Sequence, residues 1–354
     1  MKSPRRPRWP TSTTWPLPSA KCTACPRESS ASNCGRQLPL EQTRPTGLAS
    51  SWTKCLLGLT RSGFCGFIRE RIGSSHSAFG SERSPMNFPA TLPAWGFMWG
   101  LAVLIYTLCK LASWSIRTVK APLGKHLAYL LAWPGMDCDT FLGANGKEVE
   151  PPPFSEWLFS VFKIALGVAL LWGLVPLLKP GGLYLHCWVA MISLAFILHF
   201  GLFHFLSCLW RTCGCRAVPI MNWPICSANV TEFWGRRWNL AFRDLTYRFL
   251  FIPLKRPLGP SGALLVGFLV SGLVHDIVIS WPSHGGWGWP TLYFVLQGAA
   301  IVAEKSRLGR SAGLGQGILG RLFAAAIVVI PLPLLFHTEF LRNVMQPFLE
   351  AQRV

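Results

Sequence analysis

The chain has 354 residues, of which 51% are hydrophobic and only 14% are charged. An average soluble domain carries roughly 25% charged residues, so this composition excludes an ordinary soluble globular protein. The formal net charge is +19, and a strongly positive charge is common among nucleic-acid-binding proteins. Here, however, 13 of the 34 basic residues lie before Met86, and most of the others flank apolar stretches, where the positive-inside rule accounts for them. Nucleic acid is therefore not expected as a partner.

Residues 1–85 are rich in Pro, Ser, Arg and Cys and have no sustained helical or strand periodicity. Such a segment cannot bury enough surface to offset its ordering entropy. We expect it to be disordered or not to be part of the native protein, and Met86 would serve as a start site. Cys22 and Cys25 form a CxxC pair without a second pair or a His pair at finger spacing, so we predict no metal site.

From Leu92 onward, apolar stretches alternate with basic connections. We predict membrane-spanning helices at Leu92–Trp114, Leu158–Leu178, Leu183–Leu206, Gly262–Trp281, Pro290–Ala303 and Ile318–Phe336. The fifth is short for a bilayer that needs about 20 residues, so we expect it to begin in the tryptophan-rich turn before it. The stretch Leu127–Trp133 is too short to cross and is expected at the interface. Residues 86–354 are thus predicted to form an all-α polytopic membrane domain.

The basic residues also predict an orientation. If the first span ends in the cytosol, the inner connections hold 15 Lys and Arg residues, whereas the outer turns hold only Lys179. The membrane would be the endoplasmic reticulum in a eukaryote or the inner membrane in a bacterium. The longest inner connection runs from Arg211 to Ser261. Its Leu240–Pro253 part has the pattern of a helix that lies at the interface or dips into protein-lined membrane space.

The first cluster of candidate site residues begins at Asn229. Asn229 and Glu232 have the spacing of a capping box, which predicts that a helix starts there. On an α-helix, Glu232 would pair with Arg236, and Trp234 would stack on Trp238 four residues later. An aromatic and basic anchor at the membrane interface explains the same pattern, so a site and an anchor both stay open.

The second cluster lies inside the predicted span Gly262–Trp281. Adjacent ionisable residues such as His275 and Asp276 are costly in a membrane, which makes a functional site the default interpretation. His275 is about 20 Å along the helix from Gly262, beyond the bilayer midplane, and Ser271 shares its face. Asp276 points about 100° away and is expected to contact another helix. The alternative for His275 is a structural role, bonded to a neighbouring helix.

Two further histidines, His199 and His204, lie in the third predicted span. They are five residues apart, about 140° around a helix, so they are poorly placed to share a metal ion. We expect both to have packing or interfacial roles.

Three motifs together resemble the wax synthase branch of the membrane-bound O-acyltransferases. They are FWGRRWN at Phe233–Asn239, SGLVH at Ser271–His275 and AWPGMD at Ala132–Asp137. The resemblance implies a multi-helix bundle that encloses a tunnel, acyl-CoA as co-substrate, a long-chain alcohol or similar lipid hydroxyl as acceptor, and no permanently bound cofactor. Plant members often carry Glu after the histidine, where this chain has Asp276.

The resemblance also implies roles for single residues. The intramembrane histidine of the family maps onto His275 as general base, and its polar-loop residue maps onto Asn239 as a hydrogen-bond donor to the thioester. Acyl-CoA would bind to four neighbouring side chains: Trp234, Arg236, Arg237 and Trp238. The alternatives are a non-enzymatic transporter and a scaffold that binds lipid. The acceptor alcohol and the oligomeric state stay open.

Overall fold

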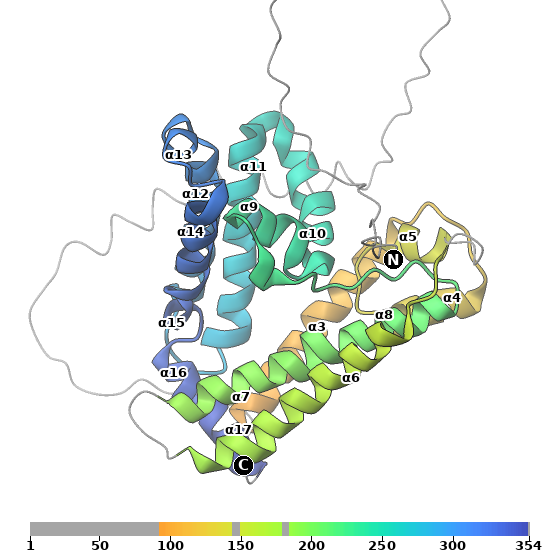
Figure 1. Ribbon diagram of the computed structural model, residues 1–354, viewed down its shortest axis with the longest axis horizontal. Coiled ribbons are helices and arrows are strands. Elements are labelled where there is room, and N and C mark those ends of the chain that lie inside the picture. The colour runs from red at the N-terminus through yellow and green to blue at the C-terminus, as the bar shows by residue number, and fades with distance from the viewer. Residues whose placement is uncertain (1–91, 144–148, 179–183, 353–354) are drawn as a thin grey trace, which may run out of the picture. The chain divides into compact units, whose positions relative to one another are not determined.

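The computed structural model describes residues 92–143, 149–178 and 184–352. The segment 1–85, expected to be disordered, therefore lies outside the described residues. Within the described ranges every regular element is helical (Figure 1): α3 (Ala94–Ser115), α4 (Leu123–Ala132), α5 (Cys138–Gly143), α6 (Phe154–Ala169), α7 (Leu185–Ala195), α8 (Phe203–Thr212), α9 (Val230–Glu232), α10 (Leu240–Thr246), α11 (Ile252–His275), α12 (Trp289–Lys305), α13 (Arg307–Ser311), α14 (Gly317–Val329), α15 (Leu332–Leu335), α16 (Thr338–Phe340) and α17 (Gln346–Ala351).

Short π-helical and 3₁₀ segments extend or join several of these helices. The π-helical segments are Leu170–Leu174, Phe196–Leu202, Phe233–Arg237, Tyr247–Phe251, Asp276–Ser280 and Leu341–Met345, and the 3₁₀ turns are Val175–Leu177 and Pro224–Cys226. A π-helical turn closes its hydrogen bonds over five residues rather than four. It therefore changes which side chains share a face, which matters at the candidate site.

Five helical stretches of the described residues are long and apolar enough to cross a membrane. They are Ala94–Ser115, Phe154–Leu177, Leu185–Thr212, Leu240–Ser280 and Gly317–Leu335. The remaining predicted span, Pro290–Ala303, corresponds to α12, a helix of 17 residues that begins at Trp289 in the tryptophan-rich turn, as expected. The all-α polytopic membrane fold predicted from the sequence is confirmed.

The outer surfaces of these stretches are apolar. On α3, Val103, Leu104 and Leu108 are each more than half exposed, and on α14 the exposed fraction of Leu322 is 62%. Soluble proteins rarely present contiguous apolar surface of this kind. Lipid is the environment that such helix faces suit.

The 41-residue stretch Leu240–Ser280 is a hairpin rather than one straight helix. The chain folds back at Gly259, whose φ of 69° and ψ of 171° are non-helical and favour glycine. Beyond the fold, a Cβ at Gly267 would lie 3.0 Å from Cγ2 of Thr246, so the two limbs are in contact. Figure 1 shows α10 and α11 side by side. The sequence predicted this division, with a separate helix over Leu240–Pro253 and a span from Gly262.

The second limb of the hairpin packs closely on α12. A Cβ at Gly272 would lie 2.6 Å from Cα of Thr291, a distance that real side chains do not tolerate, so glycine permits this crossing. Below the crossing, Ile279 and the α12 residues Tyr293 and Phe294 join one buried apolar cluster with Leu335. The hairpin, α12 and α15 therefore form one packed unit around His275.

Candidate active site

His275 is the last residue of α11, and a backbone contact fixes its ring. The ring Nδ1 lies 2.7 Å from the carbonyl oxygen of Ser271. A carbonyl only accepts hydrogen bonds, so Nδ1 must carry the hydrogen, and in the neutral ring Nε2 keeps its lone pair. The backbone carbonyl of Ser271, one helical turn earlier, orients the imidazole. The arrangement leaves the imidazole with a nitrogen that can accept a proton.

Asp276 is buried and holds the start of α12. Its Oδ1 accepts from the backbone N–H of Gly288 at 2.9 Å, and its Oδ2 accepts from the N–H of Thr291 at 3.2 Å and from the Thr291 hydroxyl. A carboxylate is also stabilised by the positive end of the helix dipole at this position. The prediction that Asp276 contacts another helix is confirmed.

A chain of polar contacts leads from Asp276 to the exposed Glu339. Ser280 Oγ donates to Asp276 Oδ1 at 2.9 Å, His337 Nε2 lies 3.3 Å from Ser280 Oγ, and His337 Nδ1 lies 3.0 Å from Glu339 Oε2. Burial lowers the pKa of His337, and the charge of Glu339 opposes that effect. The order serine, histidine, glutamate resembles a hydrolytic triad, but Ser280 is fully buried, so these contacts are structural.

The first cluster begins with a capped turn. Asn229 Oδ1 accepts from the N–H of Glu232 at 2.7 Å, and Glu232 Oε2 accepts from the N–H of Ala228 at 2.7 Å. The predicted helix start at Asn229 is confirmed. The Glu232 carboxylate reaches the residue before the cap, one position beyond a regular capping box.

The side-chain pairings predicted for this cluster are wrong. Glu232 Oε1 pairs with Arg237 Nη2 at 2.7 Å rather than with Arg236, and Trp238 stacks on Phe233, with ring centroids 5.6 Å apart, rather than on Trp234. The cause is the π-helical turn Phe233–Arg237, which brings residues five apart to one face.

Trp234 connects this cluster to His275. Its ring centroid lies 5.6 Å from that of Phe268 and 5.7 Å from that of Phe294, and its indole N–H donates to Oε1 of the fully buried Gln297 at 3.2 Å. Phe294 in turn packs on His275, with 4.3 Å between ring centroids. The two motifs, some 40 residues apart, therefore meet around one phenylalanine.

Asn239 caps α10 from a left-handed backbone conformation with φ of 42°, which asparagine adopts more readily than most residues. Its Oδ1 lies 3.5 Å from the N–H of Phe242. Thr246 and Gly267 contact each other across the hairpin and so mark the same depth on its two limbs. Measured along the helix axis from that contact, away from the turn, Asn239 lies about 10 Å along the first limb and His275 about 12 Å along the second. The hairpin therefore brings Asn239 and His275 to similar depth.

The two arginines of the cluster have different surroundings. Arg237 donates to Glu232 and to the carbonyl oxygens of Asn222 and Trp223, each at 3.3 Å. Arg236 is exposed and forms no ion pair with any described residue. Arg236 is thus the arginine available to an anionic ligand.

Sequence reasoning missed two side chains that build this site. Glu304, buried at the end of α12, accepts from the N–H of Val230 at 2.8 Å and from the Thr231 hydroxyl at 2.7 Å, which holds the start of α9. Gln297 joins Trp234 to the carbonyl of Ile327, to which its Nε2 donates at 2.7 Å. The only available signal was a polar residue at each of these positions on an apolar helix.

Backbone carbonyl groups of the third motif, Ala132–Asp137, bind a buried lysine of another helix. Lys110 of α3 donates through Nζ to the carbonyl oxygens of Trp133 and Gly135 and lies 3.4 Å from the ring centroid of Tyr129. These contacts satisfy an ammonium group inside the protein. The motif at Ala132–Asp137 therefore fixes the end of α3 to the connection that follows it.

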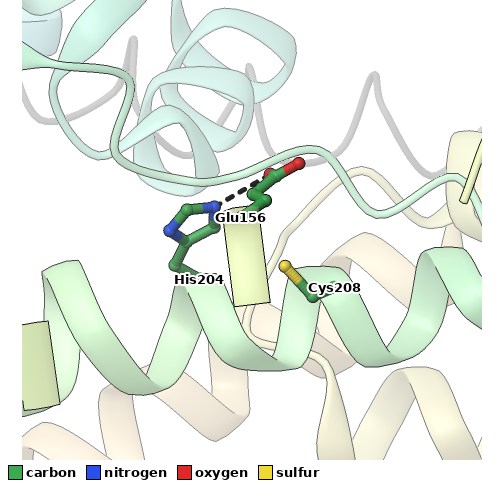
Figure 2. A group of neighbouring side chains, drawn as sticks. All are labelled: Glu156, His204 and Cys208. Atoms are coloured by element: carbon green, nitrogen blue, oxygen red, sulfur yellow. Dashed lines mark hydrogen bonds and ion pairs between the residues drawn. The ribbon is translucent and has the colours of Figure 1, made fainter. Parts of the chain in front are cut away.

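Glu156, His204 and Cys208 form a group of metal-capable side chains between α6 and α8 (Figure 2). His204 Nε2 lies 2.9 Å from Glu156 Oε1, and Arg211 donates to the same oxygen. Lys163 Nζ lies 2.6 Å from His204 Nδ1. The Arg211–Glu156 ion pair and the contacts of His204 with Glu156 and Lys163 thus join the two helices through this group.

Comparisons with known proteins show which proteins the chain resembles. Residues 217–296, which hold both clusters, match the membrane bound O-acyl transferase family. The chain is 31% identical over 171 residues to probable long-chain-alcohol O-fatty-acyltransferase 1 of Arabidopsis thaliana, which covers 44% of the chain and 48% of the relative. It is 30% identical over 130 residues to the long-chain-alcohol O-fatty-acyltransferase of Simmondsia chinensis, and the match covers 33% of the chain and 37% of the relative.

A further relative, probable long-chain-alcohol O-fatty-acyltransferase 9 of Arabidopsis thaliana, is 32% identical over 146 residues, covering 37% of the chain and 42% of the relative. The chain thus spans less than half the length of the curated relatives it matches. The resemblance predicted from Phe233–Asn239 and Ser271–His275, to the wax synthase branch of the membrane-bound O-acyltransferase family, is confirmed.

Proposed function

We propose that the chain transfers a fatty acyl group from acyl-CoA to a long-chain alcohol or a similar lipid hydroxyl, with His275 as general base. One observation carries the proposal: the Ser271 carbonyl orients the His275 ring so that Nε2 is left as the proton acceptor. The ring belongs to a membrane helix, where lipid substrates are found. The names of the relatives supply the acceptor class.

The proposed step needs only a base and an oriented thioester. Nε2 of His275 removes the proton of the alcohol as its oxygen attacks the thioester carbonyl carbon. The carbon–sulfur bond then breaks, and the CoA thiolate takes the proton from the imidazolium. The products are an ester and free CoA, and His275 returns to its starting form.

Asn239 would stabilise the oxygen that gains charge during this step. Its Oδ1 faces the N–H of Phe242, so Nδ2 can donate to the thioester oxygen. One such donor can contribute about 3 kcal/mol to lowering the barrier. The similar depth of Asn239 and His275 in the hairpin supports this role, and the tunnel that would join them stays a prediction.

Acyl-CoA would approach from the side of the basic connections, which the positive-inside rule predicts to be cytosolic. Exposed Arg236 suits a CoA phosphate, because a guanidinium binds phosphate oxygens in pairs. Arg237 would contribute by holding the motif, and Trp234 and Trp238 by shaping the mouth of the site. The acyltransferase unit in this proposal is residues 86–354.

Purified protein in lipid nanodiscs, given labelled acyl-CoA and a panel of alcohols, tests the proposal. The panel holds a long-chain alcohol, a sterol and a diacylglycerol. We expect labelled ester with the long-chain alcohol, with CoA released in equal amount. Absence of ester with every acceptor, from protein that keeps its native elution volume, would refute the proposed function.

A further inference from the structure

Trp223 and Phe159 form an exposed aromatic shelf beside the first cluster. Their rings are nearly parallel, at 13°, with centroids 5.1 Å apart. Phe159 belongs to α6, and Trp223 to the connection between α8 and α9. The exposed fraction of Trp223 is 58%, so one face of its indole is covered by Phe159 while much of the rest is open.

The backbone at Trp223 is held in an unusual conformation. Its φ of 48° lies in the left-handed region, which bulky residues rarely adopt. Arg237 stabilises it by donating to the carbonyl oxygens of Asn222 and Trp223, and the N–H of Asn222 donates to the carbonyl of Arg237 at 2.8 Å. The geometry of this turn thus depends on an arginine of the first cluster. Such strain is found at functional sites, where neighbouring contacts maintain it.

Positive charge surrounds the shelf. The side-chain amide of Asn222 reaches the carbonyl of Arg236 at 3.5 Å, which places the exposed Arg236 next to the Trp223 turn. Lys163 Nζ lies 4.6 Å from the ring centroid of Phe159. The acidic residues nearby are already paired, Glu232 with Arg237 and Glu156 with Arg211. An open aromatic face next to Arg236, which has no ion-pair partner among the described residues, matches a ligand that joins an aromatic base to a phosphate.

We propose that the shelf binds the nucleotide part of acyl-CoA, with the purine base on Trp223 and a phosphate on Arg236. This inference rests on the proposed acyltransferase function and adds a site for the half of the donor that is remote from the thioester. Every base has a π face that stacks on an aromatic side chain, and guanidinium groups bind phosphate. The rival role is an anchor in the lipid interface, since the neighbouring Ile225 is 92% exposed.

A comparison of two acyl donors distinguishes nucleotide binding from lipid anchoring. S-acyl-pantetheine has the same thioester as acyl-CoA but lacks the base and the phosphates. In Trp223→Ala, the KM for acyl-CoA should rise about tenfold, the effect of losing one stacked base. The KM for acyl-pantetheine should stay within twofold of the unmodified protein. Trp223→Phe keeps an aromatic face and should restore most of the affinity for acyl-CoA.

Trp287→Ala is the matched control, because Trp287 is also 58% exposed and lies in the turn before α12. It should change the KM for neither donor. Adenosine 3′,5′-bisphosphate should compete with acyl-CoA in the unmodified protein and lose this effect in Trp223→Ala and Arg236→Gln. Equal changes for both donors in Trp223→Ala, or undiminished competition, would overturn the shelf and favour the lipid anchor. Absence of transfer from either donor in the unmodified protein would instead contradict the proposed function.

Discussion

The imidazole of His275 packs on the ring of Phe294, with 4.3 Å between the centroids. Phe294 lies on α12 and also touches Trp234, so it sets the distance between the two sequence motifs. We expect Phe294→Ala to lower kcat about a hundredfold, because a shift of about 1 Å in a catalytic group can cost that much. Leu296→Ala on the exposed face of the same helix is the control, and steady-state transfer assays compare the two. Equal rates in both variants would show that Phe294 does not position the base.

Asp276→Asn should destabilise the protein by about 3 kcal/mol, because it removes a buried carboxylate that accepts from Ser280, Gly288 and Thr291. Asn presents an N–H₂ group where two of these donors need an acceptor. Thr291→Val removes only one of the bonds and should cost about 1 kcal/mol. Denaturation of both variants in detergent measures the difference. If Asp276→Asn unfolds like the unmodified protein, the carboxylate does not hold α12.

A double-mutant cycle tests the π-helical turn. We expect a coupling of about 1 kcal/mol between Glu232 and Arg237, whose side chains are each 22% exposed and bonded through two nitrogens. The coupling between Glu232 and Arg236 should be close to zero. Stabilities of Glu232→Gln, Arg237→Gln, Arg236→Gln and the two double variants give both values. A larger coupling to Arg236 would indicate a regular α-helix instead.

Stability should fall as the pH is lowered through the range set by His337. Burial lowers the pKa of His337 in the folded protein, whereas in the unfolded chain it is about 6.5. Between the folded and unfolded pKa values of His337 the unfolded chain binds more protons than the folded protein, so a lower pH favours unfolding. Above a pH of about 7 this loss of stability is absent. For one titrating group, the free energy of unfolding cannot change by more than about 1.4 kcal/mol per pH unit. His337→Gln should reduce this slope in melting experiments between pH 7.5 and 5.5, and an unchanged slope would exclude His337 as its source.

The sequence predicted most of the fold because apolar length and flanking charge determine where a chain enters a membrane. The division of Leu240–Ser280 into two limbs followed from the interface pattern of Leu240–Pro253 and the separate apolar span from Gly262, and the structure places the turn between them at Gly259. The role of Asp276 followed from helical angle alone. These features depend on local properties of the chain, which a single sequence contains.

The side-chain partners within the first cluster were not predictable in the same way. A π-helical turn has no local signature in FWGRRWN, so four-residue spacing wrongly predicted the partners of Glu232 and Trp238. Gln297 and Glu304 act on residues more than 60 positions earlier in the chain. Such contacts depend on tertiary packing, and the spacing of one sequence does not contain it.

The most direct measurement of the central claim is acyl transfer by His275→Ala in nanodiscs, with His126→Ala as a control outside the site. We expect His275→Ala to lose at least a hundredfold in rate, the contribution of a positioned base, while its membrane insertion and elution volume match those of the control. Transfer at the unmodified rate by correctly folded His275→Ala would contradict the role of His275 as the base.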